Sequence, residues 1–535
     1  MTSQADAQNS AAEDLAGDLA GAVERTRRSY DEAPYRSAPL IRAHPARIAA
    51  NARFLGLAAP AVAEARILEI GCASGGHLIP LAARLPRARL VGIDLSPVQI
   101  AEGQQRIARL GLGNITLAAR SLSELGPDDG QFDYILCHGV YSWIPAALRD
   151  DLLRVCKARL SPDGVAMISY NVLPGWRLFQ IARDCLQLHA GGLATHEARS
   201  AQARRLFELL AAASNDKHSY GRFWRDEARH MAAGDDAYLA HEIFEETNAP
   251  CTFRDFAARA GERGLAYLSE TCLALNTVAS LAADAAEAIV ELAGDDILAR
   301  EQYIDIFSGR SFRESLLVHA ERAASVDRAM PAARLADFDL IAPIGLAAAA
   351  VEGKPSQWII ADGEEGVVCD DADVAAAIQR LIARRPSSSR LADIAPAGVT
   401  VAQREAIAAM LLRLLKLGHL DISTQEIACA VGRPIRPKAW ELAAIDARHA
   451  NSTATLRHAP FHMAPLQRLL LLALDGTRTR DELVALVVEE GLSGNMRATS
   501  PDGPVEGRDN LTAFLGPRVD ECLAVFAGVG LLVEP

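Results

Sequence analysis

The sequence has few features that would mark a zinc protein or a nucleic-acid-binding protein. Its nine cysteines are scattered and no C-x-x-C pair occurs, which argues against a zinc site and against a disulfide framework. The sequence also has no basic excess, because 55 Lys and Arg stand against 68 Asp and Glu and the net charge is −13. Nucleic-acid-binding proteins usually carry such an excess, so nucleic acid is not an expected partner.

Long apolar runs are missing too. None approaches the roughly 18 residues that indicate a transmembrane helix, and the longest candidates, LIAPIGLAAAAV and LQRLLLLAL, suit buried elements. The first 23 residues are small, polar and acidic, without the apolar core of a secretion signal. We therefore expect no membrane partner and a cytoplasmic location, where the cysteines would stay reduced.

A chain of 535 residues exceeds what one hydrophobic core can hold, so about three or four domains are expected. After residue 60, strands and helices alternate at the spacing of right-handed crossovers, which predicts an α/β fold around a parallel sheet. The Pro- and Ser-rich stretch ARRPSSSR (383–390) indicates a linker. The predicted division is a disordered tail (1–22), N-terminal cap and lid helices (23–60), a nucleotide-binding core (61–176), a helical insertion (177–250), closing strands of the core (251–280), a mixed middle region (281–385) and a winged-helix-like C-terminal domain (391–535).

The stretch ILEIGCASGGHLIPL (67–81) has the form of a cofactor-binding turn. An apolar strand ends at Glu69, a glycine-rich turn follows, and a helix begins after the turn. The next strand, RLVGIDL, ends at Asp94, before a helix that opens with a capping box at Ser96 and Gln99. An acid at Asp94 can bind both hydroxyls of a ribose. This outline fits a dinucleotide as well as S-adenosylmethionine.

The spacing of the glycines separates these two cofactors. The dinucleotide motif G-x-G-x-x-G needs a central glycine where the backbone approaches the pyrophosphate, and this position is Ala73. S-adenosylmethionine has no pyrophosphate, so the methyl group of Ala73 costs that ligand less. Gly71 and Gly75 would let the backbone turn beneath the methionine part and the ribose, and Glu69 would orient the ligand's ammonium. We predict S-adenosylmethionine as the cofactor, and the alternative is a merely structural tight turn.

Residues after the third strand extend this site. Ser121 and Leu122 fall where the adenine lies in such a fold, although Ser121 could serve only as a helix cap. The predicted cofactor residues are Tyr30, Tyr35, Glu69, Gly71, Cys72, Ala73, Gly75, Asp94, Leu95, Ser121, Leu122 and His138.

Eight stretches of the chain match a family pattern. They are SYDEAPY (29–35), AHPARIA (43–49), ILEIGCASGGHLIP (67–80), GIDLS (92–96), HGVYSWIP (138–145), SYNVLPGW (169–176), YLAHEIFEETNAP (238–250) and EQYIDIFSGRSFRESLL (301–317). On these residues the chain resembles class I S-adenosylmethionine-dependent methyltransferases with a methyltransferase regulatory domain, including rickettsial-type protein lysine methyltransferases. The resemblance covers roughly residues 29–320 and is looser in the C-terminal third. His77 departs from the pattern, which has Asn at this position.

The resemblance implies a Rossmann-like core, in which a mostly parallel seven-stranded sheet forms the S-adenosylmethionine-binding domain. It also implies that residues 177–250 hold a dimerisation segment, and therefore a homodimer. The middle and C-terminal domains would frame an open cleft for a protein substrate.

Catalytic candidates follow the fourth strand, in HGVYSW, at the edge of the sheet where ligands bind in such folds. A lysine amine with a pKa near 10.4 is almost entirely protonated at pH 7, so a site that methylates it must remove the proton. His138 is the titratable group there, Tyr141 can accept an amine proton, and Trp143 offers a face to a cation. Alternatively, His138 hydrogen-bonds the cofactor, and Tyr141 and Trp143 only pack.

The segment SYDEAPY raises a similar choice. Tyr30 and Tyr35 precede the first core helix and are placed to cover the cofactor as a lid, whereas Asp31 and Glu32 could be a solvated pair. His44 and Arg47 could line the same pocket, although a helix-capping role fits them better.

Three functional hypotheses remain open at this stage. The first is a methyltransferase that acts on a protein, most plausibly on lysine. The second is a methyltransferase of the same class that acts on a small molecule. The third is a cofactor-sensing regulator without catalysis. No metal site is predicted, since Pro460 interrupts the spacing of His458 and His462.

Overall fold

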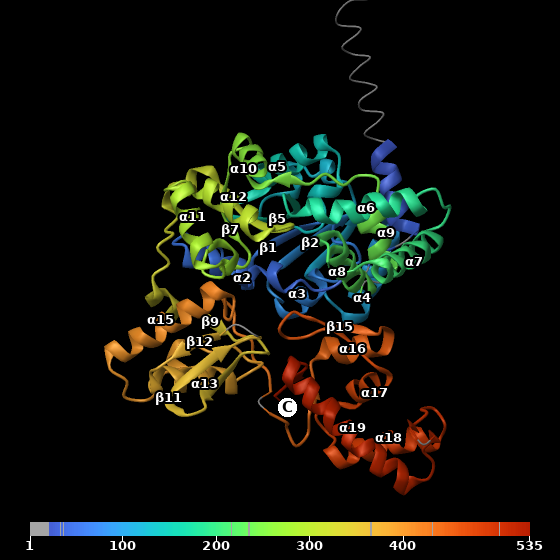
Figure 1. Ribbon diagram of the computed structural model, residues 1–535. Coiled ribbons are helices and arrows are strands. Elements are labelled where there is room, and N and C mark those ends of the chain that lie inside the picture. Colours follow the sequence, from blue (N-terminus) through green and yellow to red (C-terminus); the bar gives the residue numbers. More distant parts are fainter. Residues whose placement is uncertain are drawn as a thin grey trace, which may run out of the picture.

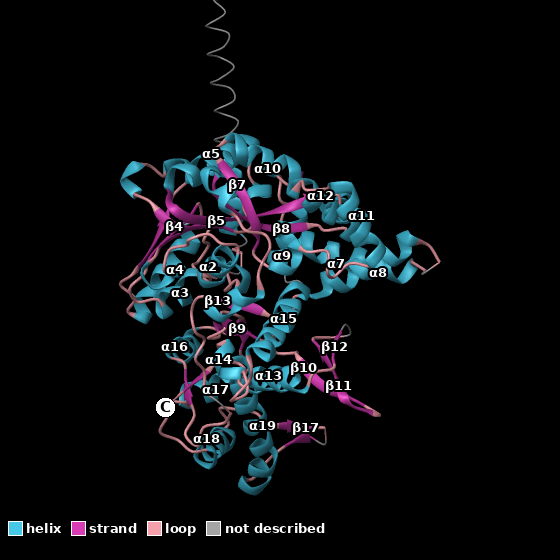
Figure 2. Ribbon diagram, turned by 90° about the vertical axis from the view of Figure 1, so that its left-hand side faces the viewer, coloured by secondary structure: helices cyan, strands magenta, loops and turns pink. Residues whose placement is uncertain are grey.

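The structure is a computed structural model that describes residues 21–32, 34–35, 37–215, 217–233, 236–363, 366–430, 432–501 and 503–534. Most of the predicted disordered tail, residues 1–20, lies outside the described residues, and residues 21–32 form a helix. Figure 1 shows an α/β core above two further lobes, and Figure 2 shows both lobes on the same side of that core. Among the helices in the described ranges, none is both long and apolar enough to span a bilayer.

Seven strands form the central sheet in the order β3-β2-β1-β4-β5-β8-β7, and the short β6 pairs with β5 beside this path. Neighbours among β1 to β5 are parallel, whereas β8 is antiparallel to both β5 and β7. The predicted mostly parallel sheet is confirmed. The strands are β1 (Arg66–Ile70), β2 (Arg89–Asp94), β3 (Ile115–Ala119), β4 (Phe132–Cys137), β5 (Leu160–Leu173), β6 (Cys251–Thr252), β7 (Leu265–Glu270) and β8 (Phe312–His319).

The antiparallel strand β8 comes from an unexpected part of the chain. The sequence predicted that residues 251–280 close the sheet, and β6 and β7 do lie there. However, β8 is the stretch SFRESLLVH of the predicted middle region, and it fills the place between β5 and β7. Its apolar residues mark it as a strand, but local sequence does not reveal to which sheet a strand belongs.

Alternate side chains of the sheet face two separate hydrophobic clusters. On β1, Ile67 belongs to one cluster and Leu68 to the other, and Tyr134 and Ile135 of β4 divide in the same way. This division follows from the alternating direction of side chains along a strand. The first cluster includes α2 (Pro45–Phe54), α3 (Leu78–Arg84) and α4 (Pro97–Leu110), and the second includes α5 (Ala146–Arg159) and α10 (Phe253–Glu262).

Ser96 caps α4 as predicted, with one difference. Its Oγ accepts the Gln99 backbone N–H at 3.2 Å, and Pro97 occupies the first helical turn. In a complete capping box the Gln99 side chain would accept the Ser96 N–H. This N–H instead donates to Asp94 Oδ1 at 2.9 Å. That half of the predicted capping box is wrong. The exchange ties the end of β2 to the start of α4.

The stretch between β5 and β6 folds into four helices with a small core of their own. Ala182, Leu186, Phe207 and Trp224 are buried in that core. We call these helices the helical insertion. They are α6 (Trp176–Ala190), α7 (His196–Ala213), α8 (Ser219–Ala233) and α9 (Asp236–Phe244).

A middle lobe follows α11 (Ala283–Ala293) and α12 (Ile297–Ser308). The predicted linker at 383–390 does not divide it, because Ser388 and Ser389 are buried. Ser388 Oγ donates to Asp339 Oδ1 at 3.2 Å and accepts the Ile427 N–H at 2.9 Å. The lobe therefore continues past the predicted boundary at residue 391. Its elements are β9 (Asp339–Ile341), β10 (Ala347–Val351), β11 (Lys354–Ala361), β12 (Gly366–Cys369), α13 (Ala372–Ala383), α14 (Leu391–Ile394), α15 (Val401–Leu417) and β13 (Asp421–Ser423).

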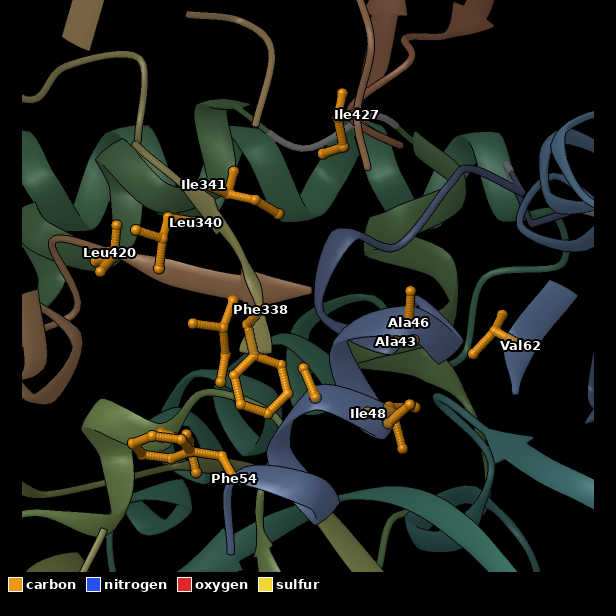
Figure 3. Close-up of a cluster of buried hydrophobic side chains, with 14 of the residues drawn as sticks. Ala43, Ala46, Ile48, Phe54, Val62, Phe338, Leu340, Ile341, Leu420 and Ile427 are labelled. Carbon is orange, nitrogen blue, oxygen red and sulfur yellow. The ribbon is translucent and has the colours of Figure 1, made fainter. Parts of the chain in front are cut away.

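The middle lobe shares a hydrophobic cluster with the core. Figure 3 shows Ile48 and Phe54 of α2 facing Phe338, Leu340 and neighbouring apolar side chains of the lobe. The rings of Phe54 and Phe338 lie 6.0 Å apart. Almost every side chain of α2 is buried, because the helix is packed between the sheet and this lobe.

The C-terminal lobe has a core of its own, built around Leu483, Val487 and Phe526. In Figure 1 it lies at the lower right, beneath α3 and α4. Its elements are β14 (Lys438–Ala439), α16 (Glu441–His449), β15 (Ser452–Ala454), β16 (Pro460–His462), α17 (Pro465–Ala473), α18 (Arg480–Leu492), β17 (Thr499–Ser500), β18 (Gly503–Pro504), α19 (Arg508–Val529) and β19 (Leu532–Val533).

Candidate functional site

A cavity of about 670 Å³ opens at the carboxyl ends of β1, β2 and β4. This is the edge of an open α/β sheet at which ligands generally bind. Twelve predicted site residues line it, while Gly75 and Tyr141 do not. The twelve are Tyr30, Tyr35, Glu69, Gly71, Cys72, Ala73, Asp94, Leu95, Ser121, Leu122, His138 and Trp143.

The glycine-rich turn has an unusual backbone. Gly71, Ala73 and Gly75 have φ angles of 77°, 49° and 74°, a left-handed region that favours glycine and strains alanine. A Cβ atom on Gly71 would lie 2.4 Å from the Val140 side chain, which itself lines the cavity. One on Gly75 would lie 2.9 Å from Leu117. Gly75 is therefore needed for the shape of the turn, although it does not line the cavity.

The two acids flanking the turn are buried in different ways. Burial, together with the charge of Asp94, raises the pKa of Glu69 well above its usual range, and Glu69 Oε2 has no hydrogen-bond partner among the described residues. Asp94 accepts the N–H of Ala73 on Oδ2 at 2.8 Å and that of Ser96 on Oδ1 at 2.9 Å. Burial also raises the pKa of Asp94, although these amides oppose the shift.

These groups fit S-adenosylmethionine. The unpartnered Glu69 carboxyl suits the ligand's ammonium, since a buried carboxylate is costly until it is paired. Asp94 is oriented by its two amides and keeps a lone pair on each oxygen for a ribose hydroxyl. Ser121 has both of the roles considered above, because it lines the cavity and also caps the 3-10 helix Leu122–Glu124.

The segment before the core forms one wall of the cavity. Tyr30 stacks on His241 of α9, with ring centroids 4.3 Å apart, and the Tyr35 ring lies 5.9 Å from the same imidazole. Asp31 is not a solvated residue, since it accepts the Ser96 hydroxyl at 2.6 Å and pairs with Arg27. The segment is therefore fastened to both the core and the helical insertion.

His44 and Arg47 lie outside the cavity wall. His44 Nδ1 accepts the Ala46 N–H at 3.1 Å and caps α2, which confirms the capping role. Arg47 pairs with Asp421 of the middle lobe at 2.8 Å.

Two of the three catalytic candidates reach the cavity. His138 lines it, with Nε2 3.6 Å from Glu314 Oε1. Burial alone would raise the pKa of Glu314, but the adjacent His138 imidazole holds it below its usual range. Trp143 also lines the cavity, and the Arg183 guanidinium lies over its ring at 5.9 Å. The predicted cation on the face of Trp143 is therefore Arg183 of the protein itself.

Tyr141 is placed differently from the prediction. It is buried against Tyr170 and Phe256, with ring centroids 5.9 and 5.3 Å away. Burial raises its pKa to about 12. The prediction that Tyr141 accepts an amine proton is wrong, because a position at a strand end does not determine which way a side chain points.

Several further residues that line the cavity were not predicted from the sequence. They are Trp176, Phe179, Glu227, His241, Glu242 and Phe312. Burial raises the pKa of Glu242 to about 7. Among the described residues lining the cavity there is no Lys or Arg, whereas four are acidic. The stretch HEIFEE (241–246) lacks the second His of a zinc protease, so its sequence does not mark these residues as a site.

His77, the departure from the family pattern, is buried at the cavity wall and contacts the C-terminal lobe. Its Nδ1 accepts the Leu40 N–H at 3.1 Å and lies 2.9 Å from His458 Nε2. Burial lowers the pKa of His77 to about 3 and that of His458 well below its usual range. Both imidazoles are therefore neutral at physiological pH.

Known proteins resemble the chain along most of its length. Family models match at residues 67–164 (methyltransferase domain), 235–319 (predicted methyltransferase regulatory domain) and 436–531 (PKMT, C-terminal winged helix domain). The uncharacterized protein RP789 of Rickettsia prowazekii is 38% identical over 291 residues, which are 54% of this chain and 52% of that protein. The uncharacterized protein RP028 of the same organism is 34% identical over 236 residues, 44% of this chain and 94% of that protein. The chain thus spans about half the length of the first relative.

A solved structure extends the likeness to the whole fold. The structure of PKMT2 from Rickettsia typhi in complex with AdoHcy is 27% identical, with a TM-score of 0.82 over 94% of this chain and 100% of that one. Together with the family models, this likeness confirms the predicted fold, family and S-adenosylmethionine cofactor. The chain belongs to the class I S-adenosylmethionine-dependent methyltransferases that combine a methyltransferase regulatory domain with a PKMT-type winged-helix domain.

Proposed function

We propose that the protein methylates the side-chain amine of lysine residues in other proteins. S-adenosylmethionine, when bound, supplies a methyl group activated by a positively charged sulfur. Among this chain's residues, Glu69, Asp94 and the turn between them would hold that cofactor. The family and the cavity support the reaction class, and the kind of acceptor is inferred from the residues around the cavity.

The observation that carries the amine assignment is the charge of the cavity wall. Its described residues include no Lys or Arg and, besides the cofactor residues Glu69 and Asp94, two further acids, Glu227 and Glu242. A cationic amine finds opposite charge there, while a carboxylate acceptor would enter without a counter-charge and would pay for its desolvation. A small anionic acceptor is therefore disfavoured.

His138 is the proposed acid–base residue. Since Nε2 faces Glu314 at 3.6 Å, the other ring nitrogen, Nδ1, is left to accept a proton from the amine. The carboxylate of Glu314 favours this orientation and stabilises the imidazolium that forms. Glu314 is held in turn by the Thr271 hydroxyl, which donates to its Oε2 at 3.1 Å.

The test uses purified full-length protein, methyl-labelled S-adenosylmethionine and a cell lysate. We expect label in protein bands and methyl-lysine after hydrolysis, and we expect Asp94→Asn to reduce both. Label only in the small-molecule fraction would support the second hypothesis instead. Cofactor binding without any label would support a sensing role.

We also propose that two copies pair through the helical insertion, as expected for residues 177–250. Leu188 of α6 is 90% exposed, and Leu209 of α7 and Tyr220 of α8 are more than half exposed. Large apolar side chains exposed together are typical of a surface that another protein covers. Light scattering should give twice the chain mass for the wild type and the single mass for Leu188→Glu combined with Leu209→Glu. A monomeric wild type would refute the pairing.

A further inference from the structure

The helical insertion forms one side of the cavity, which we call the insertion side. Trp176 and Phe179 come from α6, Glu242 comes from α9, and Trp143 stands opposite them after β4. The Trp143 and Trp176 rings meet edge to face, with centroids 6.5 Å apart, and Trp176 packs on Phe179 at 4.6 Å. The insertion side of the cavity is therefore lined by flat apolar surfaces.

Glu242 supplies negative charge to these surfaces. The buried Arg183 donates hydrogen bonds to the main-chain carbonyls of Glu242, at 2.8 Å, and of Glu245. Arg183 thus caps the end of α9 and lies over Trp143, so it fixes the helix against the aromatic wall. Its donors are used on the backbone, and the Glu242 side chain lines the cavity.

Burial makes the charge of Glu242 costly unless a cation pairs with it. The raised pKa of Glu242, about 7, reflects this cost, and the charges of Arg183 and His241 reduce it only in part. A carboxyl group in this condition gains most from a ligand that brings a positive charge. An anionic or neutral ligand would bring no such gain.

From this geometry we propose that the insertion side is an ammonium-binding subsite for the acceptor. Glu242 pairs with the side-chain ammonium before His138 takes its proton, and Trp143 and Trp176 pack along the methylene chain that carries it. Flat aromatic walls suit an unbranched chain. The inference rests on the proposed function and adds which residues select lysine.

The subsite also predicts which substitutions are harmless. Glu208 of α7 belongs to the same helical insertion, is exposed, and does not line the cavity. Glu208→Gln removes the same charge from the same part of the chain as Glu242→Gln, so it is the matched control.

The experiment measures binding of two probes to the full chain saturated with S-adenosylhomocysteine. One probe is Nα-acetyl-lysine amide and the other is its norleucine counterpart, which has a similar chain without the charge. Calorimetry on the wild type should show preference for the lysine probe. Glu242→Gln should reduce that preference by about tenfold or more, Glu242→Asp by less, and Glu208→Gln not at all.

Affinity for S-adenosylhomocysteine should be the same in all four proteins, which shows that the variants are folded. The proposal is overturned if the wild type binds both probes equally, or if Glu242→Gln keeps the wild-type preference. Methyl transfer to lysine, measured in parallel, separates the two levels of inference. Methyl-lysine formation with an unchanged KM in Glu242→Gln refutes the subsite alone, whereas no methyl-lysine from the wild type refutes the proposed function.

Discussion

A buried arginine beside the catalytic edge offers a strong test of how the core is held together. Arg313 of β8 is enclosed, with 1% of its surface exposed. Its guanidinium donates to Asp305 at 2.8 to 3.1 Å, to Glu270 at 2.6 Å and to Glu301 at 3.2 Å. It also lies over the Phe253 ring at 4.1 Å. One cation thus serves three buried carboxyl groups from β7 and α12.

Replacing Arg313 by methionine keeps much of the volume and removes the charge. The three carboxyl groups would then lose their shared cation and would have to take up protons or stay charged in a dry interior. Removal of one partner from a buried ion pair costs about 3 to 5 kcal/mol, and with three carboxyl groups affected we expect the upper part of this range. Domain stabilities are roughly 5 to 15 kcal/mol, so this change should be severe.

The matched control is Arg480→Met in the C-terminal lobe. Arg480 binds Asp520 through two hydrogen bonds of 3.0 and 2.7 Å, but the two side chains are 45% and 36% exposed. Exposed pairs contribute only about 0 to 1 kcal/mol. Both arginines bind carboxylates at similar distances, and Arg480 also binds Asp481 at 3.0 Å; they differ mainly in burial and in the number of carboxyl groups served.

Urea unfolding, combined with hydrogen exchange of peptides from β7, β8 and α12, measures the effect where it should arise. In Arg313→Met, exchange in these elements should speed up by at least a hundredfold, while the C-terminal lobe should be unaffected. If Arg313→Met costs no more stability than Arg480→Met, the carboxyl groups are already satisfied by protonation and the reasoning is wrong.

Three further predictions concern the cofactor wall and pH. Asp94→Asn should weaken S-adenosylhomocysteine binding by about tenfold to a hundredfold, since hydrogen bonds to a charged group contribute about 1.5 to 3 kcal/mol; unchanged calorimetric affinity would exclude Asp94 from the site. Tyr30→Ala should weaken it roughly two- to tenfold through loss of the stacking on His241, whereas Tyr220→Ala, on exposed α8 surface, should not; equal effects would argue against a lid. Burial raises the pKa of Asp305 from 3.8 to about 6. Between these pH values the folded state holds a proton on Asp305 that the unfolded state has lost. The contribution of this group to the free energy of unfolding therefore falls by at most about 3 kcal/mol as the pH rises from 4 to 6. The difference in urea midpoint between the wild type and Asp305→Asn should therefore change between pH 4 and pH 6. An equal difference at both pH values would count against the raised pKa.

The cofactor end of the cavity could be predicted because its parts are local in sequence. Glu69, the glycine-rich turn and Asp94 occur within two consecutive strand–turn–helix units, and parallel strands bring their carboxyl ends to one edge. The chemistry of that edge then follows from the residue types. The fold class was predictable for the same reason, since strand–helix alternation is a local pattern.

The insertion side of the cavity could not be predicted in this way. Glu242 reaches the cavity from a helix more than a hundred residues after the fourth strand, and no local pattern indicates that this helix folds back over the sheet. The Ser-rich stretch at 383–390 misled for a related reason. Ser388 and Ser389 resemble linker residues in composition, yet their polar groups are used in buried hydrogen bonds. The composition of a segment shows that it is polar, but whether the segment is exposed or buried depends on the hydrogen-bond partners that the rest of the fold supplies.

The contact between His77 and His458 fastens the C-terminal lobe to the wall of the cavity. The Leu40 N–H donates to His77 Nδ1, so this nitrogen carries no proton, and the short contact at 2.9 Å requires His458 Nε2 to be the donor. His458 makes this contact with a φ of 61°, a strained conformation for a residue other than glycine. Arg106 of α4 adds an ion pair with Asp446 of α16 at 2.7 Å. Any displacement of the lobe must therefore break contacts with α3 and α4, the helices that follow the two cofactor-binding strands.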